Sequence, residues 1–401
     1  MNHSSKYSSK VANNMIHATV VGIGPEPVPA VLVPSAPPIE CDINSTPWPV
    51  QEPSELTPSL ISQLNHCGLT KGLAMALREN ALVFPLRVWI IDNSGSMNMV
   101  DGHRIVESSR TRQIKIVEAT RWEQVLESVN YHAQMASFMN APTTFRLLNR
   151  NARIPKHEFT IAQNGYNPSE VSEVRSFMSR LSPGGMTPLT AHIDHIRYSI
   201  ITPMISKLRS TGQKVSIIIA TDGLPTNQNG YCNKQTKDQF IASLRSLEGL
   251  PVWIVIRLCT DEEDIVDFYK EIDKELELSV EVLSDYICEA EDVYDHNKWL
   301  NYGLPLHRCR ELGFDNRLFE LMNERALTKG EIQQFCSILF GGDELDGVPD
   351  PYEDFDGFLS NIDRIMESSD LNQFNPITKK IEPWINTKRL RGELDCFCTV
   401  S

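Results

Sequence analysis

The chain has 401 residues, of which 41% are hydrophobic and 22% charged, as in proteins with a substantial core. Its net charge of −14 argues against nucleic acid as a partner, because phosphates would be repelled. No apolar run approaches the length of a membrane-spanning helix, and the N-terminal sequence has no apolar signal core. The nine cysteines contain no CxxC pair. We therefore expect a cytoplasmic protein with reduced thiols.

The first part of the chain is rich in proline. Residues 1–56 include the segment GPEPVPAVLVPSAPPIE, and such a density of proline disfavours regular helices and central strands. We expect this segment to be disordered. Residues 57–84 then predict a helical lead-in, which starts with Thr57 as an N-cap and Pro58 in the first turn.

Residues 85–285 alternate between strand and helix patterns and predict a doubly wound, mostly parallel α/β sheet. The segments KVSIIIATDG and VWIVIRLC are uninterrupted apolar strands, typical of a sheet covered on both faces. TTFRLLN and HEFTIAQ are short alternating strands, one of which we expect to run antiparallel near an edge. Between the strands, Ile114–Met139 is interpreted as one long helix.

The pattern changes again after the sheet. Residues 286–375 predict a helical C-terminal extension, and residues 376–401 a basic tail. Acidic residues dominate 261–295 and 343–356, which we interpret as a solvated helix face and a surface loop.

Oxygen-bearing side chains follow two of the predicted buried strands. VWIIDNSGSM places Asp92, Ser94 and Ser96 directly after one strand, and VSIIIATDG places Asp222 after another. Between them, the loop PGGMTPL supplies Thr187. Two carboxylates and three hydroxyls are the donors that a hard divalent cation such as Mg²⁺ prefers. The carboxyl ends of strands in such a sheet are also where ligands bind.

This arrangement of Asp-x-Ser-x-Ser, a distant Thr and a distant Asp resembles the metal-ion-dependent adhesion site of von Willebrand factor A domains. The resemblance covers about residues 85–285. It implies that Ser94, Ser96 and Thr187 ligate Mg²⁺ (or Mn²⁺ or Ca²⁺) directly, with Asp92 and Asp222 acting directly or through water. It also implies that a Glu or Asp carboxylate from a protein partner completes the coordination. Intracellular members of this family act mainly as scaffolds, so we expect a binding module and not an enzyme.

Two alternatives remain open from the sequence. One is a metal-dependent hydrolase, although no general base is evident, and Ser94 lacks a GxSxG frame. The other is a docking subunit of a chaperone, ubiquitin or chelatase complex. His192 and His195 have a spacing that would suit a metal, but without a third placed ligand we expect them to lie on a solvated helix surface.

The C-terminal sequence matches a lipidation pattern. The last four residues, which begin at Cys398, fit C-a-a-X, and the final Ser favours a farnesyl group. Cys396 is a candidate for a second acyl chain. Five basic residues precede the two cysteines: Lys379, Lys380, Lys388, Arg389 and Arg391. We expect these basic residues and the cysteines to follow the folded region. The pattern predicts prenylation and attachment to the cytosolic face of a membrane.

Overall fold

The structure, a computed structural model, describes residues 52–108, 113–150, 156–369 and 372–397, without the side chains of the last four. These residues belong to a single unit that spans Ser45–Ser401. Most of the predicted proline-rich segment and Cys398 therefore lie outside the described residues. Within the described ranges, no helix combines the length and the apolar character needed to cross a bilayer.

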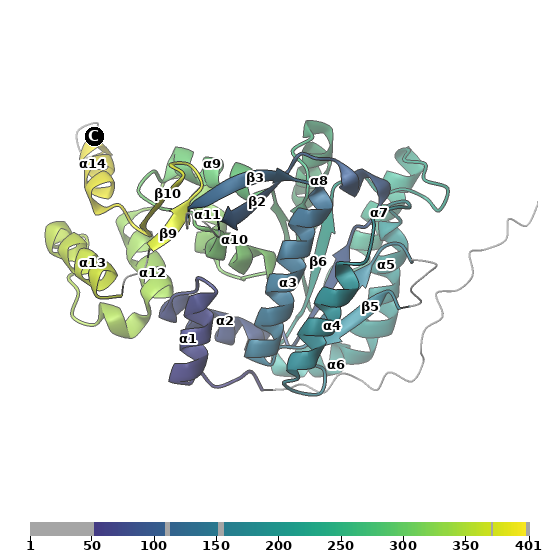
Figure 1. The fold of residues 1–401 in the computed structure, drawn as a ribbon, viewed down its shortest axis with the longest axis horizontal. Coiled ribbons are helices and arrows are strands. Elements are labelled where there is room, and N and C mark those ends of the chain that lie inside the picture. Colours follow the sequence, from purple (N-terminus) through teal and green to yellow (C-terminus); the bar gives the residue numbers. More distant parts are fainter. Residues whose placement is uncertain (1–51, 109–112, 151–155, 370–371, 398–401) are drawn as a thin grey trace, which may run out of the picture. The chain divides into compact units, whose positions relative to one another are not determined.

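Six strands form a central sheet in the order β5-β4-β1-β6-β7-β8 (Figure 1). They are β1 (Leu86–Ile91), β4 (Thr143–Leu147), β5 (Glu158–Ile161), β6 (Val215–Thr221), β7 (Val252–Leu258) and β8 (Val280–Leu283). All neighbours pair in parallel except β5, which runs antiparallel to β4 at the edge. The predicted mixed α/β class, the mostly parallel sheet and the antiparallel edge strand are thus confirmed.

Alternate residues of the central strands feed two separate cores. Trp89 and Ile91 of β1 face α3 (Arg121–Met139) and α4 (Pro168–Met178), whereas Val88 and Ile90 face the helices of the opposite layer. That layer contains α5 (Leu189–Ile196), α6 (Thr202–Thr211), α7 (Lys234–Arg245) and α8 (Glu263–Glu275), with a short π-helical segment, Arg197–Ile201, between α5 and α6. Burial on both faces explains why β6 and β7 lack polar alternation.

A third core joins the helical lead-in to the C-terminal extension. Its helices are α1 (Pro58–His66), α2 (Lys71–Val83), α9 (Tyr286–His296), α10 (Leu304–Glu311), α11 (Arg317–Glu324), α12 (Lys329–Phe340), α13 (Phe355–Ser369) and α14 (Thr387–Phe397). Helix α2 packs closely on α12, since a Cβ on Gly72 would lie 2.4 Å from the backbone nitrogen of Gly341. The two ends of the described chain therefore stabilise each other.

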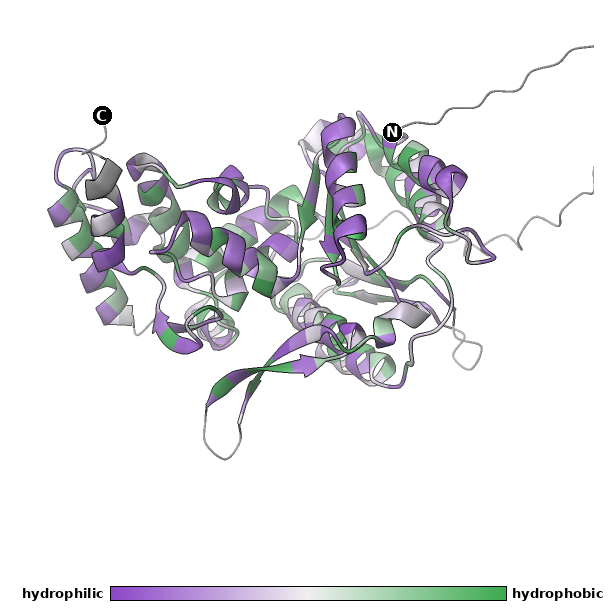
Figure 2. Ribbon diagram, turned by 90° about the horizontal axis from the view of Figure 1, so that it is seen from above, coloured by the Kyte–Doolittle hydropathy of each residue, from purple (hydrophilic) through white to green (hydrophobic). Residues whose placement is uncertain are grey.

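The prediction of one long helix over Ile114–Met139 is wrong at its start. Residues Ile114–Ala119 form strand β3, which pairs antiparallel with β2 (Gly102–Glu107) in a hairpin that projects from the body of the molecule (Figure 2). Helix α3 begins only at Arg121, where Thr120 and Glu123 form a capping box. The β-branched residues of Ile114–Ala119 favour a strand, and the cap separates it from the helix.

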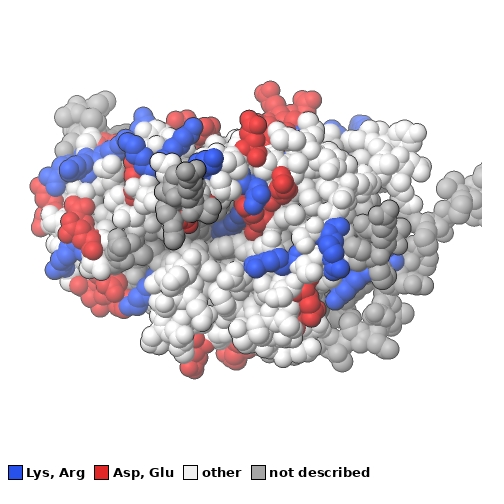
Figure 3. Space-filling view, in the orientation of Figure 1, with Lys and Arg blue, Asp and Glu red and all other residues white. Residues whose placement is uncertain are grey.

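The interpretation of residues 261–295 as a solvated acidic face is only partly right. Acidic side chains do cover α8 on the face drawn in Figure 3. However, Glu281 and Glu289 are buried, and both accept hydrogen bonds from Arg310, at 2.8 Å and 2.6 Å. These carboxylates attach the edge strand β8 and helix α9 to α10 by buried ion pairs.

The expectation that the basic residues follow the folded region is also wrong. Strands β9 (Asn372–Asn375) and β10 (Lys380–Pro383) form a hairpin, and α14 follows. Trp384 and Leu390 are buried in the third core. Basic side chains gather over α14 and the neighbouring part of β10 (Figure 3), so this segment presents a basic surface from a folded element.

Candidate functional site

The candidate metal residues lie at the carboxyl ends of two adjacent central strands. Asp92 follows β1 and Asp222 follows β6, and these strands pair in parallel over Leu86–Ile91 and Val215–Ala220. From β1 the chain first builds β4 on one side and later β6 on the other side. This reversal of strand order is the position at which open α/β sheets bind ligands.

A chain of hydrogen bonds connects the residues of the two strand ends. The hydroxyl oxygens of Ser94 and Ser96 lie 3.0 Å apart, and the Ser96 hydroxyl donates to Oδ1 of Asp222 at 2.8 Å. Asp92 accepts the backbone N–H of Ser94 at 2.8 Å and the Thr221 hydroxyl at 2.7 Å. Each carboxylate therefore accepts a hydrogen bond from a residue at the other strand end.

Thr187 reaches this cluster from the loop before α5. A Cβ on Gly223, the residue after Asp222, would lie 3.7 Å from the Thr187 hydroxyl oxygen. The backbone N–H of Thr187 donates to the Thr226 hydroxyl at 3.0 Å, which attaches the threonine loop to the loop after β6. The structure thus brings all five predicted residues to one edge of the sheet.

Two asparagines that the sequence patterns did not indicate, Asn93 and Asn149, connect the loops around the candidate site. Asn149, just after β4, accepts the backbone N–H of Met186 at 3.1 Å, and its own N–H donates to the side-chain oxygen of Asn93 at 2.8 Å. Gly185 has φ +107°, and a Cβ there would lie 2.5 Å from Asn149 Oδ1. Only glycine fits this approach without strain. No spacing in the sequence indicates these contacts.

Burial changes the acid strength of both carboxylates. Asp92 and Asp222 are 0% and 1% exposed, whereas Ser96 is exposed and opens the cluster to solvent. Burial, together with the neighbouring Asp222, raises the pKa of Asp92 to about 6. Burial also raises the pKa of Asp222, although hydrogen bonds from Ser96 and Arg121 oppose that shift.

Arg121 is the second group that sequence reasoning missed. It is the first residue of α3, and its Nη1 donates to Oδ2 of Asp222 at 3.0 Å. The same guanidinium contacts Asp101 and Glu262. Arg121 was missed because the sequence pattern predicted it in the interior of a longer helix, Ile114–Met139, and not at the start of one.

The donor set fits a hard cation. Carboxylate and hydroxyl oxygens converge from three loops, and they are the ligand class of Mg²⁺, Mn²⁺ and Ca²⁺. No group of three or more His, Cys, Asp or Glu side chains that would hold a metal occurs among the described residues. Hydroxyl donors would therefore have to supply much of the coordination.

The two helical histidines do not form a second metal site. His192 is buried, contrary to the expected solvated surface, and its Nε2 lies 3.1 Å from the Leu148 carbonyl oxygen. His195 Nδ1 lies 2.6 Å from Nη1 of Arg146, a cation that would repel a metal ion. Burial and Arg146 lower the pKa of both histidines, to about 3 and about 4. Both therefore have a structural role beside the sheet.

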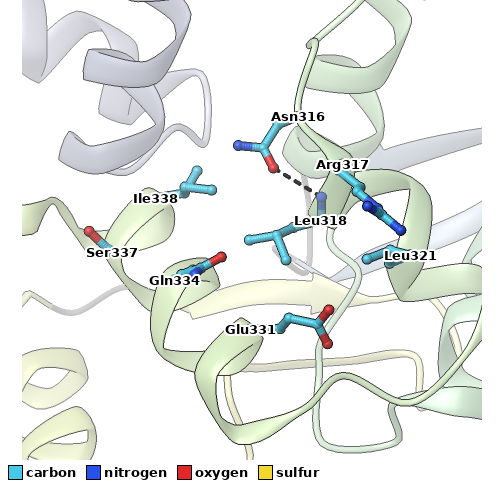
Figure 4. A pocket seen from close by; sticks show the side chains of 8 residues that line it. All are labelled: Asn316, Arg317, Leu318, Leu321, Glu331, Gln334, Ser337 and Ile338. Atoms are coloured by element: carbon cyan, nitrogen blue, oxygen red, sulfur yellow. Dashed lines mark hydrogen bonds between the residues drawn. The ribbon is translucent and has the colours of Figure 1, made fainter. Parts of the chain in front are cut away.

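A groove of about 510 Å³ between α11 and α12 has fewer groups that could bind a metal or take part in a reaction. Its walls mix apolar and amide side chains, and Asn316 accepts the backbone N–H of Leu318 at 3.0 Å (Figure 4). Glu331 is engaged by Arg325 and by the N-cap Thr328. These contacts lower the pKa of Glu331 to about 2, and the hydrogen bond with Arg325 contributes most. None of the candidate metal residues lines this groove.

Comparisons with known proteins give little more. No family model matches the chain, and no curated protein matches it. Among solved structures, the SpaC pilus adhesin of Lactobacillus rhamnosus GG matches with 15% identity and a TM-score of 0.31, over 50% of this chain and 28% of that one. A mutant of the PilB minor pilin of Streptococcus sanguinis matches with 13% identity and a TM-score of 0.30, over 50% and 56%. At these scores neither bears on the fold or function of this chain.

Proposed function

We propose that the chain is a protein-binding module of the von Willebrand factor A type, whose Mg²⁺ site takes a Glu or Asp carboxylate from a partner. The observation that carries this proposal is the convergence of five oxygen-bearing side chains at the switch point of the sheet: Asp92, Ser94, Ser96, Thr187 and Asp222. Ser94, Ser96 and Thr187 would hold the ion, with the two aspartates as direct or water-mediated acids. When bound, the ion would supply a Lewis-acidic position for the carboxylate.

Two further features support binding over catalysis. The hydroxyls of Ser94 and Ser96 are hydrogen-bonded to each other, and that of Ser96 donates to Asp222; among the described residues, no histidine is hydrogen-bonded to either hydroxyl. The buried carboxylate of Asp92 is held by a hydroxyl and a backbone donor. Mg²⁺-dependent hydrolysis, the alternative, would show as phosphatase turnover that disappears in Asp222→Ala. Docking within a chaperone, ubiquitin or chelatase complex would differ only in the partner.

Ser96→Ala tests the site directly. Loss of the hydroxyl that joins Ser94 to Asp222 is expected to weaken Mg²⁺ or Mn²⁺ binding by about tenfold or more, because the ion loses a ligand and Asp222 loses an orienting bond. Isothermal titration calorimetry on the full chain measures this. Ser206→Ala, an exposed serine on α6, is the matched control and should bind like wild type. If Ser96→Ala binds Mg²⁺ or Mn²⁺ with the affinity of wild type, the proposed metal site is wrong.

We also propose that the C-terminal sequence is prenylated at Cys398, with the basic surface of α14 as the second membrane signal. One prenyl chain gives only marginal anchoring, whereas each basic side chain near an anionic leaflet adds about 1 kcal/mol. Lys388, Arg389 and Arg391 are exposed, which suits this role.

Cys398→Ser is expected to move the protein from membranes to the soluble fraction of eukaryotic cells, because the prenyl acceptor is lost. Fractionation with intact-mass analysis checks this. Cys232→Ser, at an exposed cysteine, serves as the control. An unmodified mass that ends in Ser401 would contradict the lipid anchor.

A further inference from the structure

The guanidinium of Arg121 lies in a cage of three carboxylates beside the candidate site. Nε and Nη2 donate to the two oxygens of Asp101 at 2.7 Å and 2.6 Å, and Nη2 also donates to Glu262 at 2.9 Å. Nη1 donates to Asp222 at 3.0 Å. The Arg121 side chain is 1% exposed, so the guanidinium is held in place by these hydrogen bonds and is largely out of contact with water.

The three carboxylates come from three different elements. Asp101 lies at the base of the β2–β3 hairpin, Asp222 follows β6, and Glu262 precedes α8. The backbone N–H of Arg121 also donates to the Met99 carbonyl at 3.0 Å. Figure 1 shows β3 leading into α3, and Arg121 is the first residue of that helix. A displacement of Arg121 would therefore disturb the candidate metal loops themselves.

Asp222 divides its two oxygens between opposite neighbours. Oδ1 accepts the Ser96 hydroxyl on the side of the candidate site, and Oδ2 accepts Arg121 on the other. A guanidinium does not lose its proton in proteins, so the positive charge next to Asp222 is permanent. Because the pair is buried, this charge is poorly screened and offsets the attraction of Asp222 for a second cation. Asp101 and Glu262 are 39% and 53% exposed, so water screens their charges more effectively.

We propose that Arg121 is a built-in counter-cation that weakens the affinity of the site for a divalent ion. The ion is then held firmly only when an external carboxylate completes its coordination. This inference rests on the proposed function, and it makes metal binding and carboxylate binding mutually dependent.

Two substitutions separate the charge of Arg121 from its shape. Arg121→Met removes the charge and keeps a long side chain, so Mn²⁺ binding to the full chain is expected to tighten by about tenfold or more in calorimetry. Arg121→Lys keeps the charge but cannot reproduce the four hydrogen bonds of the guanidinium, so it is expected to bind Mn²⁺ less tightly than Arg121→Met. Saturating acetate should tighten Mn²⁺ binding in wild type, and clearly less in Arg121→Met. Unchanged or weaker Mn²⁺ binding by a folded Arg121→Met protein overturns the inference.

A triple variant covers the case in which Arg121→Met alone does not fold. Arg121→Met combined with Asp101→Asn and Glu262→Gln removes the mutual repulsion of the emptied cage. Its local charge is less negative than that of wild type, because two acids and one base are lost. A simple net-charge effect therefore predicts weaker Mn²⁺ binding, whereas a counter-cation in contact with Asp222 predicts tighter binding. Weaker binding by the triple variant overturns the inference.

The same titrations separate this inference from the proposed function. If wild type binds Mn²⁺ and Arg121→Met binds equally, only the counter-cation is wrong. If neither protein binds Mn²⁺, both proposals fail. Adding Asp92→Asn to Arg121→Met should abolish the gain in affinity. A gain that survives Asp92→Asn would mean that the ion occupies the space vacated by the guanidinium, which also overturns the inference.

Discussion

Glu311→Ala is expected to lower the free energy of unfolding by about 3–5 kcal/mol, the usual cost of removing one partner of a buried ion pair. Glu311 is 0% exposed and is the last residue of α10, where it contacts residues of α3 and β7. It accepts hydrogen bonds from Arg308 at 2.7 Å, Arg257 at 3.2 Å and Ser128 at 3.1 Å, and His132 Nε2 lies at 2.8 Å. Without the carboxylate, two buried guanidinium groups lose their shared counter-charge.

Urea unfolding of the full chain measures the effect. Glu275→Ala is the matched control, because its contact with Arg245 is exposed and is expected to contribute less than about 1 kcal/mol. If Glu311→Ala lowers the free energy of unfolding no more than Glu275→Ala does, the buried network does not hold the sheet and the helical extension together.

The pH dependence of this effect has a definite sign. Burial alone would raise the pKa of Glu311, but Arg308, His132 and His307 hold it well below its usual range. The unfolded chain therefore binds the proton more readily than the folded chain. The stabilisation is present above the usual pKa of glutamate, about 4.3, and is lost as the pH falls below it. The stability difference between wild type and Glu311→Gln should narrow under the same acid conditions.

The central sheet was predictable because its strands are buried on both faces. Residues Val215–Thr221 and Val252–Leu258 are fully buried and mostly apolar, without the regular polar alternation of a half-exposed strand, a pattern typical of a sheet covered on both faces. The β2–β3 hairpin was missed because the apolar residues of Ile114–Ala119 continue into those of α3. The capping box of Thr120 and Glu123 is the local signal that locates the true start of the helix.

The candidate site was predictable only in part, for a different reason. Asp92, Ser94 and Ser96 lie within five residues of one another, so their proximity follows from local spacing. The contact of Arg121 with Asp222 joins residues 101 positions apart, and Asn149 contacts Asn93 from 56 positions away. Such contacts depend on how α3 and β4 pack on β1. Strand and helix patterns carry no information about them.

Asp92→Asn is expected to weaken Mg²⁺ binding by about a hundredfold while the loop keeps its shape. Asp92 is 0% exposed and accepts hydrogen bonds from Ser94 and Thr221, so it also organises the loop after β1. Asparagine can keep the bond from the Ser94 N–H and remove the negative charge. Alanine would lose both hydrogen bonds as well as the charge, which makes it a poorer test of metal binding.

Calorimetric titration with Mg²⁺ and the shift of the melting temperature in Mg²⁺ are two independent readouts of this substitution. An ion that binds only the folded state raises its stability by RT ln(1 + [Mg²⁺]/Kd), so the shift should largely disappear in Asp92→Asn. Asp238→Asn, at an exposed position on α7, is the charge-matched control and should retain the full shift. If Asp92→Asn keeps both the wild-type affinity and the wild-type shift, then any Mg²⁺ bound by this protein lies elsewhere. The converging hydroxyls and carboxylates would then be a hydrogen-bonded strand-end network, held together by Arg121 and the two asparagines.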